Sequence, residues 1–460
     1  MSLHNLLRER EALKKPLRVG MIGAGRYGSM YLAQSRSIPG KQIVGIADLN
    51  LGKTRDYCKR VGFPEESIGV ANSANAINDL AKKGKIALTD DAEALINADL
   101  DVIVEATGTV DAAARHAWRS FESGKHVVMV SAEADALLGI ALQQKAEENG
   151  VVYSLGYGDE PSELCEQIDW ARTSGFEVAC VGKYIEYTPE KRYVNPENVW
   201  QFKTNLPKEL IASGDLNAKM FSSFLDGTKT LTETCCAANA AKLIPPQNGM
   251  TFPTLEYDDM PNMLKPRSEG GILEHNGTIE VPSNRHPDGT PVKRHLRWGV
   301  FISIKACSSY AISVLKEFNR EDRVRIDDTG QYAVMYRPTH VLGLELGKSV
   351  ASVGLLGEPT GYPISFVADM VCVAKKDLKP GEMLDGPGAF AVYGQLMPAS
   401  VSLKNSYLPT GLSENVKVVK PVSRDSILTY GDVEIDENLF SYRIRKEVEQ
   451  GKFKSKYSEI

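Results

Sequence analysis

A glycine-rich turn between two apolar runs is the first feature with chemical meaning. Gly23, Gly25 and Gly28 follow the apolar run Val19–Ile22, and Asp48 ends the next apolar run, Ile43 to Ala47. In this spacing the first glycine permits a tight turn, the second lets backbone approach a pyrophosphate, and the third lets a helix pack on a strand. The pattern predicts a dinucleotide-binding turn.

The residues around this turn bear on the choice of dinucleotide. Arg26 and Tyr27 open the expected helix, whose free N–H groups and positive dipole end favour phosphate. Asp48 can accept hydrogen bonds from a ribose diol, which favours NAD(H). Lys53 and Arg55 lie a few residues further on and could enclose the 2′-phosphate of NADP(H).

Two further turns follow apolar runs and are expected beside the nicotinamide. Ligands of parallel sheets bind outside the carboxyl ends of the strands. The run Asp101–Glu105 ends in a small-residue turn, and so does the run His126–Val130. The candidate cofactor contacts in these turns are Ala106, Thr107, Gly108, Thr109, Ser131 and Glu133.

Two lysines further along the chain could serve carbonyl reduction. Hydride transfer to a carbonyl builds negative charge on oxygen, and a cation or proton donor must face that oxygen. Lys183 lies in a strand-like run, and Lys229 follows a Gly-Thr turn before a helix. Glu233 has the spacing of a helical ion pair with Lys229 and could hold it in place. For each lysine the alternative is a solvated surface position.

Paired acids at the start of another helix allow two roles. Asp159 and Glu160 precede Pro161, which suits the first turn of a helix. They could ligate a divalent metal ion or act as base toward a substrate hydroxyl. Alternatively, they complement the helix dipole.

Basic residues concentrate in the central part of an otherwise acidic chain. A phosphorylated substrate would use such a cluster, whereas a zwitterionic amino acid needs a more balanced pocket. The alternative is a basic surface patch. The members are Lys183, Lys191, Arg192, Lys203 and Lys229.

The pattern of apolar runs predicts the elements that position these residues. Runs without alternation, separated by helical stretches, indicate a parallel sheet covered on both faces. Strand and turn signals dominate after about Val350. The expected α/β chain has a dinucleotide-binding domain over 1–155, a catalytic α/β domain over 156–348 and a small β-rich domain over 349–460.

Bulk properties exclude several classes of partner. The formal net charge of −5 gives no reason to expect nucleic acid or an anionic membrane. No apolar run approaches the roughly 18 residues that span a bilayer. Seven cysteines without a Cys-x-x-Cys pair indicate reduced thiols, a cytoplasmic protein and no zinc site.

Several short sequences together resemble a known family. They run in order along nearly the whole chain: Val104-Glu-Ala-Thr-Gly108, Gly124 to Asp135, Gly158-Asp-Glu-Pro161, Asp226-Gly-Thr-Lys229 with Glu233 and Ala238-Asn-Ala240, Tyr336-Arg-Pro338 with His340, and Ala374 to Asp385. The chain resembles the homoserine dehydrogenase-like oxidoreductases that carry a C-terminal SAF domain. The resemblance implies a Rossmann domain, a central domain that is catalytic and forms homo-oligomers, and a SAF domain.

One branch of this family suggests a substrate. It resembles a second type of 1-deoxy-D-xylulose 5-phosphate reductoisomerase, which uses NADPH in isoprenoid precursor synthesis. That branch tilts the expected cofactor to NADP(H) and the substrate to a phosphosugar. The alternatives are a homoserine dehydrogenase-like or other sugar-acid dehydrogenase, and a dinucleotide-binding sensor without turnover. The sensor would have no need for the central basic and acidic motifs.

Overall fold

The structure is a computed structural model that forms two compact units. It describes residues 2–202, 207–208, 211, 216–297, 299–319 and 324–456. Unit 1 comprises 1–162, 341–364 and 439–460, and unit 2 comprises 163–340 and 365–438. The chain therefore returns to the N-terminal unit twice after leaving it.

Unit 1 contains the predicted parallel sheet. Its seven strands lie in the order β3-β4-β2-β1-β5-β6-β7, and neighbouring strands pair in parallel. The apolar runs form strands because both faces of the sheet are covered, so nearly every strand residue is buried. The strands are β1(Leu17–Ile22), β2(Lys41–Ala47), β3(Ile68–Val70), β4(Ile86–Thr89), β5(Val102–Glu105), β6(His126–Met129) and β7(Tyr153–Leu155).

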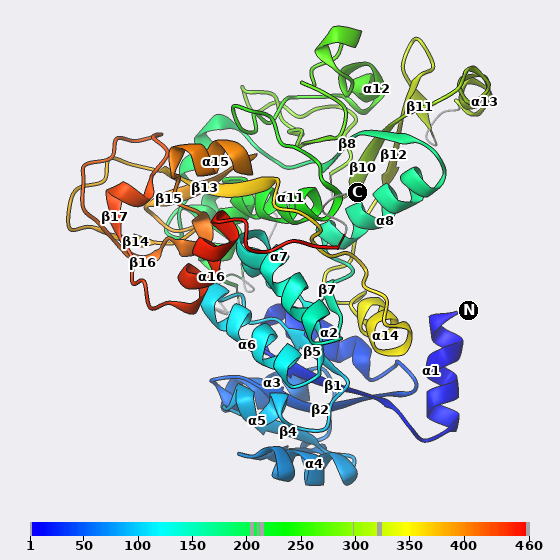
Figure 1. Cartoon of the computed structure of the whole chain (residues 1–460), viewed down its shortest axis with the longest axis vertical. Helices are drawn as coiled ribbons and strands as arrows, with labels where there is room; N and C mark the ends of the chain where they lie inside the picture. Colours follow the sequence, from blue (N-terminus) through cyan, green and yellow to red (C-terminus); the bar gives the residue numbers. More distant parts are fainter. Residues whose placement is uncertain are drawn as a thin grey trace. The chain divides into compact units, whose positions relative to one another are not determined.

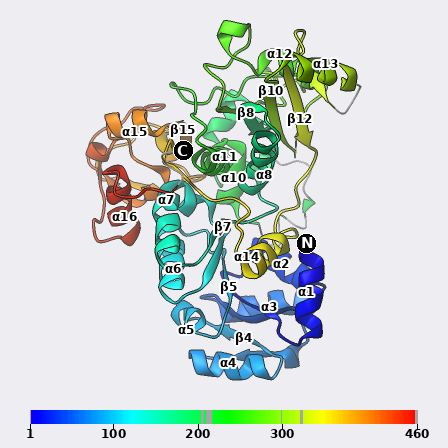
Figure 2. The ribbon, with the colours of Figure 1, turned by 45° about the vertical axis from the view of Figure 1, so that its right-hand side comes forward.

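Helices from three parts of the sequence cover this sheet. α14 contacts β1, β5, β6 and β7, and its Val350 and Val353 belong to the same buried core as Val19 and Val104. Figures 1 and 2 show α6 and α7 side by side, with the C-terminal helix α16 against them. The helices of unit 1 are α1(Leu3–Ala12), α2(Arg26–Ser35), α3(Leu51–Arg60), α4(Ala74–Lys82), α5(Ala92–Ile96), α6(Val110–Glu122), α7(Ala132–Glu148), α14(Gly347–Leu356) and α16(Phe440–Glu449).

Unit 2 is built on a mixed sheet of five strands in the order β11-β12-β10-β8-β9. Only the β8–β9 pair is parallel. The short strand β9 lies in a stretch from Pro245 to Arg294 that is rich in Gly, Pro, Asn and Asp, which predicts mostly loop. The strands are β8(Glu177–Lys183), β9(Thr278–Glu280), β10(Val300–Lys305), β11(Arg325–Ile326) and β12(Tyr332–Arg337).

The central helix of unit 2 is α11(Thr228–Ala241), in which every residue except Ala240 is buried. The sequence analysis places Lys229 before this helix, but the helix begins at Thr228 and includes Lys229. Asp226 Oδ1 accepts the N–H of Thr228 at 2.9 Å, which satisfies an otherwise free donor of the first turn. The other helices of the central segment are α8(Glu160–Thr173), which begins in unit 1, α10(Ala218–Leu225), α12(Met260–Met263) and α13(Ser309–Phe318).

The β-rich region near the C-terminus forms two small sheets and groups with unit 2. β13 and β15 pair antiparallel, β14, β16 and β17 form a second sheet, and both β13 and β15 contact α11. The division of the chain into three domains stays a prediction. The elements are β13(Ala368–Ala374), β14(Met383–Asp385), β15(Val392–Pro398), α15(Ala399–Asn405), β16(Glu414–Val418) and β17(Val433–Glu434).

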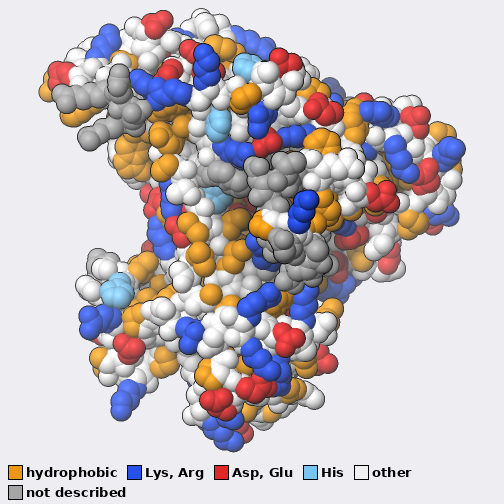
Figure 3. Space-filling view, turned by 180° about the vertical axis from the view of Figure 1, so that it is seen from behind, with side chains coloured by type: hydrophobic (Ala, Val, Ile, Leu, Met, Phe, Trp, Pro, Cys, Tyr) orange, Lys and Arg blue, Asp and Glu red, His pale blue; other side chains and the backbone are white. Residues whose placement is uncertain are grey.

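Lys and Arg side chains are interspersed with Asp and Glu side chains on the face shown in Figure 3. Among the described residues, none of the helices has the length and apolar character needed to cross a membrane. The 3-10 turns are η1(Glu65–Ser67), η2(Pro189–Tyr193), η3(Val199–Phe202), η4(Tyr257–Asp259), η5(Arg267–Glu269), η6(Thr410–Leu412) and η7(Tyr430–Asp432).

Candidate active site

The three glycines of the N-terminal turn have distinct surroundings in the structure. Gly23 has φ +91°, and a Cβ there would lie 2.6 Å from the carbonyl oxygen of Ala106. A Cβ on Gly28 would lie 2.8 Å from the carbonyl oxygen of Gly23, so α2 packs closely on the turn. A Cβ on Gly25, by contrast, would meet nothing within 4 Å. The open space over Gly25, at the N-terminus of α2, fits a bound pyrophosphate.

Asp48 holds this turn in place. Its Oδ2 accepts the N–H of Ala24 at 2.8 Å, and its Oδ1 accepts the N–H of Asn50 at 2.9 Å. A carboxylate has about four lone-pair sites, so two such bonds leave capacity for a ribose diol. Of the other residues in this region, Arg26 is exposed and Tyr27 is half-buried at the start of α2.

Lys53 and Arg55, the two basic residues after Asp48, both contact neighbouring side chains. The Lys53 ammonium lies 5.6 Å from the centre of the Tyr57 ring, and Arg55 forms an ion pair with Glu65 at 2.5 Å. All four side chains are on α3 or just beyond it. A 2′-phosphate would therefore have to compete with these contacts.

A buried carboxylate that the sequence analysis did not single out joins the turns after β5 and β6. Glu105 is fully buried at the end of β5. It accepts the hydroxyl of Thr107 at 2.7 Å and that of Ser131 at 2.6 Å, and Nδ1 of His116 lies 3.3 Å away. Ser131 Oγ in turn accepts the N–H of Gly108 at 2.9 Å. Four candidate cofactor residues, Ala106 to Thr109, thus share a turn cross-linked to Ser131.

The remaining residues of these turns start helices. Thr109 is the exposed residue before α6, and the half-buried Glu133 lies in the first turn of α7. An acid that ends a wholly apolar strand, as in Val-Ile-Val-Glu105, was the available signal for the missed carboxylate.

Asp159 and Glu160 are buried at the start of α8. Their exposed fractions are 7% and 2%. Burying a charged group is costly unless it is paired or hydrogen-bonded. In the described part of the chain, no group of three or more His, Cys, Asp and Glu side chains is arranged to hold a metal ion.

In unit 2, Lys229 and Glu233 form the ion pair that their spacing allows. Lys229 Nζ lies 3.3 Å from Glu233 Oε1 in the first turns of the buried helix α11. Both side chains are at least nine-tenths buried. The ammonium therefore has a fixed carboxylate neighbour rather than bulk water around it.

A cationic cluster surrounds one carboxylate next to this helix start. Lys191 Nζ lies 2.9 Å from Glu186 Oε1, Arg297 bonds to Oε2, and Arg285 lies 3.8 Å away. Burial tends to raise the pKa of Glu186, but the Lys191 hydrogen bond and the charges of Lys191, Arg297 and Arg285 outweigh it and hold that pKa below its usual value. Three cations against one anion leave net positive charge.

Aromatic contacts connect the cationic cluster to the start of α11. Arg192 donates to the Tyr187 hydroxyl at 3.1 Å, and the centres of the Tyr187 and Phe252 rings lie 4.2 Å apart. A Cβ on Gly227 would come within 2.8 Å of the Phe252 ring. The structure thus brings Lys191 and Arg192 into one neighbourhood with the turn that carries Lys229.

Two predicted members of the basic cluster are Lys183 and Lys203. Lys183 is half-buried at the end of β8, opposite Val300 of β10. Lys203 lies outside the described residues. Arg285 and Arg297, which the sequence analysis missed, lie in loops before β10, where no pattern marked them.

Comparison with protein families assigns two parts of the chain. Residues 41–155 match the model described as "Homoserine dehydrogenase, NAD binding domain", and residues 158–346 match "Oxidoreductase DRL, catalytic domain". The curated proteins contain no match to this chain.

Solved structures of dehydrogenases are also similar, at low identity. A homoserine dehydrogenase from Thiobacillus denitrificans is 14% identical over 80% of this chain and 84% of that chain, with TM-score 0.41. A scyllo-inositol dehydrogenase from Lactobacillus casei with bound NAD(H) and scyllo-inositol is 16% identical over 42% of this chain and 51% of that chain, with TM-score 0.26. An oxidoreductase domain protein from Kribbella flavida is 16% identical over 39% and 44%, with TM-score 0.27.

Coverage differs widely among these structures. The chain spans less than half the length of the first structures it matches, 45–48% of each. The family matches, by contrast, cover strands β2 to β7 of the parallel sheet and the segment that carries Lys229 and the cationic cluster. Together they show that residues 41–155 resemble a homoserine dehydrogenase-type NAD-binding domain and that residues 158–346 resemble an oxidoreductase catalytic domain.

Proposed function

We propose that this enzyme uses NADPH to reduce a phosphorylated carbonyl compound, in the manner of a 1-deoxy-D-xylulose 5-phosphate reductoisomerase of the second type. The observation that carries the proposal is the cationic cluster of Lys191, Arg285 and Arg297 around Glu186. Arginine and lysine side chains grouped in this way suit a phosphate dianion. The pairing with Glu186 keeps the cations in place until the substrate binds.

The residues at the start of α11 supply the chemistry expected at the carbonyl. The bound nicotinamide would provide the hydride. Lys229 would stabilise the negative charge that develops on the carbonyl oxygen, and Glu233 would keep the ammonium oriented. A cation in a water-poor site stabilises such charge more strongly than one in water.

The roles of Lys183 and of the acidic pair extend this proposal. Lys183 would contact either the carbonyl oxygen or the phosphate. Asp159 and Glu160, both buried at the start of α8, would act as base toward a substrate hydroxyl.

Residues near the glycine turn bear on the choice between NADPH and NADH in opposite directions. Asp48 disfavours a 2′-phosphate, and Lys53 and Arg55 favour one. NADPH is proposed because the reductoisomerase branch uses it, with NADH as the alternative. We also propose that the chain forms a homo-oligomer through its central domain, carries a SAF-type C-terminal domain and is cytoplasmic.

A second candidate is a homoserine dehydrogenase-like enzyme on the same scaffold. The match of residues 41–155 to that family's NAD-binding domain favours it. Its amino acid substrate would not need the excess of positive charge around Glu186. A sensor without turnover is the least favoured reading, because the central segment matches a catalytic domain.

One panel of assays separates the three functions. NADPH oxidation would be followed with 1-deoxy-D-xylulose 5-phosphate and with aspartate semialdehyde. We expect turnover of the phosphosugar alone; turnover of the semialdehyde alone would establish the second candidate, and turnover of neither would favour the sensor.

A pair of arginine variants tests the phosphate contact itself. Arg285→Met should raise KM for the phosphosugar about tenfold or more, since a charge-assisted hydrogen bond contributes about 1.5–3 kcal/mol. Arg294→Met is the matched control, because Arg294 lies nearby in the same loop but pairs with Asp258. Equal KM values in the two variants would refute the assignment of the phosphate to this cluster.

A further inference from the structure

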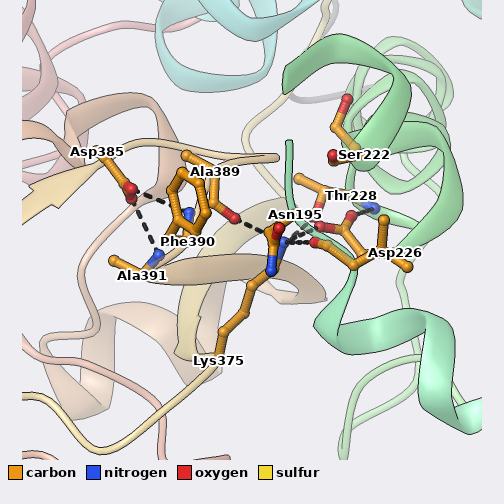
Figure 4. Close-up of polar contacts among 12 residues, drawn as sticks. Asn195, Ser222, Asp226, Thr228, Lys375, Asp385, Ala389, Phe390 and Ala391 are labelled. Atoms are coloured by element: carbon orange, nitrogen blue, oxygen red, sulfur yellow. Dashed lines mark hydrogen bonds and ion pairs between the residues drawn. The ribbon is translucent and has the colours of Figure 1, made fainter. Parts of the chain in front are cut away.

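A buried lysine from the β-rich segment contacts three parts of unit 2 at once. Lys375, just after β13, is 6% exposed. Its ammonium lies 2.7 Å from Asp226 Oδ2 and donates to the carbonyl oxygens of Val194 at 2.6 Å and Ala389 at 3.0 Å. Figure 4 shows the side chain extended toward Asp226 with these contacts around its nitrogen. The ammonium thus makes two hydrogen bonds and one ion pair, all within the protein.

Two of the three partners adjoin the candidate active site. Asp226 caps α11 through the N–H of Thr228, and it precedes Gly227, whose φ of +88° turns the chain into Lys229. Val194 directly follows the basic segment that contains Lys191 and Arg192. Lys375 therefore links the turn before Lys229 with the segment that supplies Lys191 to the cluster.

The third partner anchors the β-rich segment itself. Ala389 lies in the loop before β15, and Asp385 holds that loop by accepting the N–H groups of Phe390 at 2.9 Å and Ala391 at 3.0 Å (Figure 4). The loop carbonyl is thus presented to Lys375 by a structured turn.

A second contact ties the same β-rich segment to α11. The N–H of Gly394 in β15 donates to Thr228 Oγ1 at 2.8 Å. A Cβ on Gly394 would lie 2.8 Å from Thr228 Cγ2, so only glycine permits this approach without a shift. The first turn of α11 is consequently held from two sides.

A buried ion pair of this kind sets geometry at a cost in desolvation. Asp226 and Lys375 have side-chain exposures of 0% and 3%. Charges this deep are tolerated only when paired and hydrogen-bonded, so small shifts of either partner are strongly disfavoured. The pair suits a turn whose position must be defined closely.

We propose that Lys375 is a positioning residue for the active site. It fixes the Asp226–Lys229 turn relative to Val194, so that the Lys229 ammonium and the cations of the cluster address one substrate molecule. The β-rich segment is then part of the catalytic unit rather than an appendage. The proposal rests on the proposed function in its assignment of substrate contacts to Lys229 and the cluster.

A matched pair of variants tests this role. Lys375→Met removes the ammonium and keeps the length of the side chain. Lys265→Met is the control: Lys265 forms another buried ion pair in unit 2, with Asp327 at 3.0 Å, and contacts neither Asp226 nor Val194. Both variants should lose thermal stability, because each leaves a buried carboxylate without its cation.

Only the Lys375 variant should change the kinetics of the folded enzyme. Misplacing a catalytic group by about 1 Å can cost 10²-fold in rate, so we expect kcat to fall and KM for the phosphosugar to rise, with kcat/KM lower by about 10²-fold. KM for NADPH should stay unchanged. If the Lys375→Met protein does not fold, the double variant Lys375→Met with Asp226→Asn removes both charges, keeps an acceptor for the Thr228 N–H, and should show the same loss.

Hydrogen exchange separates this proposal from the proposed function. Without any substrate, Lys375→Met should speed amide exchange at 190–195 and 226–233, whereas Lys265→Met should not. If the wild-type enzyme does not turn over the phosphosugar, the proposed function fails while the exchange result still decides whether Lys375 holds these segments. Wild-type exchange there, or wild-type kinetics in a folded Lys375 variant, would overturn the positioning role.

Discussion

Replacing Gly25 by valine should abolish tight cofactor binding without harming the fold. Gly25 has φ −67° and ψ −165°, values that any L-residue adopts, and a Cβ there would enter open space. Valine is therefore compatible with the empty protein. Its branched side chain would fill the space over the N-terminus of α2 that a pyrophosphate needs.

The expected loss follows from the contacts that the side chain would block. Hydrogen bonds to a charged group contribute about 1.5–3 kcal/mol each. Losing one backbone contact to the pyrophosphate should weaken binding by roughly 10- to 10²-fold, at about 1.4 kcal/mol per factor of ten. Isothermal titration with NADPH and with NADH measures the change, and circular dichroism reports the melting temperature.

Gly28→Ala serves as the control, because this substitution should lower the stability of the fold, whereas Gly25→Val should not. A Cβ there would lie 2.8 Å from the Gly23 carbonyl oxygen and 3.2 Å from Met21, so the helix must shift. Such overpacking costs about 1–3 kcal/mol of stability. We expect a lower melting temperature for Gly28→Ala and an unchanged one for Gly25→Val. A folded Gly25→Val protein with wild-type affinity would show that the pyrophosphate binds elsewhere.

Three further outcomes are expected. Lys229→Met and Lys183→Met should each lower kcat by about 10²-fold, since one lost oxyanion partner costs roughly 2.7–4 kcal/mol, while cofactor affinity stays the same. If Lys183 instead holds the phosphate, its loss should raise KM more than it lowers kcat. Near wild-type rates in both variants would place the active site elsewhere. NADPH should be preferred over NADH when both are compared in one steady-state assay, and a roughly tenfold preference for NADH would contradict this. Burial raises the pKa of Glu280 from 4.5 to about 7, so the folded state holds this proton more tightly than the unfolded state does. At 1.36 kcal/mol per pKa unit, this proton contributes about 3 kcal/mol to the free energy of unfolding. The contribution is present below pH 4.5 and is lost as pH rises through 7. Urea unfolding at pH 5 and pH 8 should therefore show a smaller loss of stability at the higher pH for Glu280→Gln than for wild type, and equal losses would refute the assignment.

The parallel sheet was predictable because its signals are local. Strands buried on both faces must be apolar throughout, and β1, β2, β5 and β6 each read as such a run in the sequence. The three-residue strand β9 was missed, since its pairing with β8 depends on a distant segment and leaves no periodicity to detect. The start of α11 was also missed, because the cap from Asp226 is a side-chain contact and not an apolar pattern.

The candidate site residues likewise divide into those with a local signal in the sequence and those without one. The glycine turn could be read because Gly23 and Gly28 meet backbone demands within the turn and Gly25 leaves open space at the start of the helix. Arg285 and Arg297 could not, because only the folded loops bring them to Glu186. Lys375 is an extreme case: its neighbours in sequence, Lys376 and Asp377, are exposed and charged, so nothing local distinguishes the buried lysine from a solvated one.

The two strand-end carboxylates of unit 1 suggest why acids recur beside cofactor turns. Asp48 after β2 accepts a backbone N–H of the glycine turn, and Glu105 at the end of β5 accepts the hydroxyls of Thr107 and Ser131. Turns at the carboxyl edge of a parallel sheet expose N–H and O–H donors that no strand pairs. An ionised carboxylate accepts several such donors at once and charge-assisted bonds are the stronger ones, so a single acid can fix a whole turn. The sequence pattern of an acid closing an apolar strand therefore predicts an ordered turn, and ligand contact is a second role that the same oxygens can take.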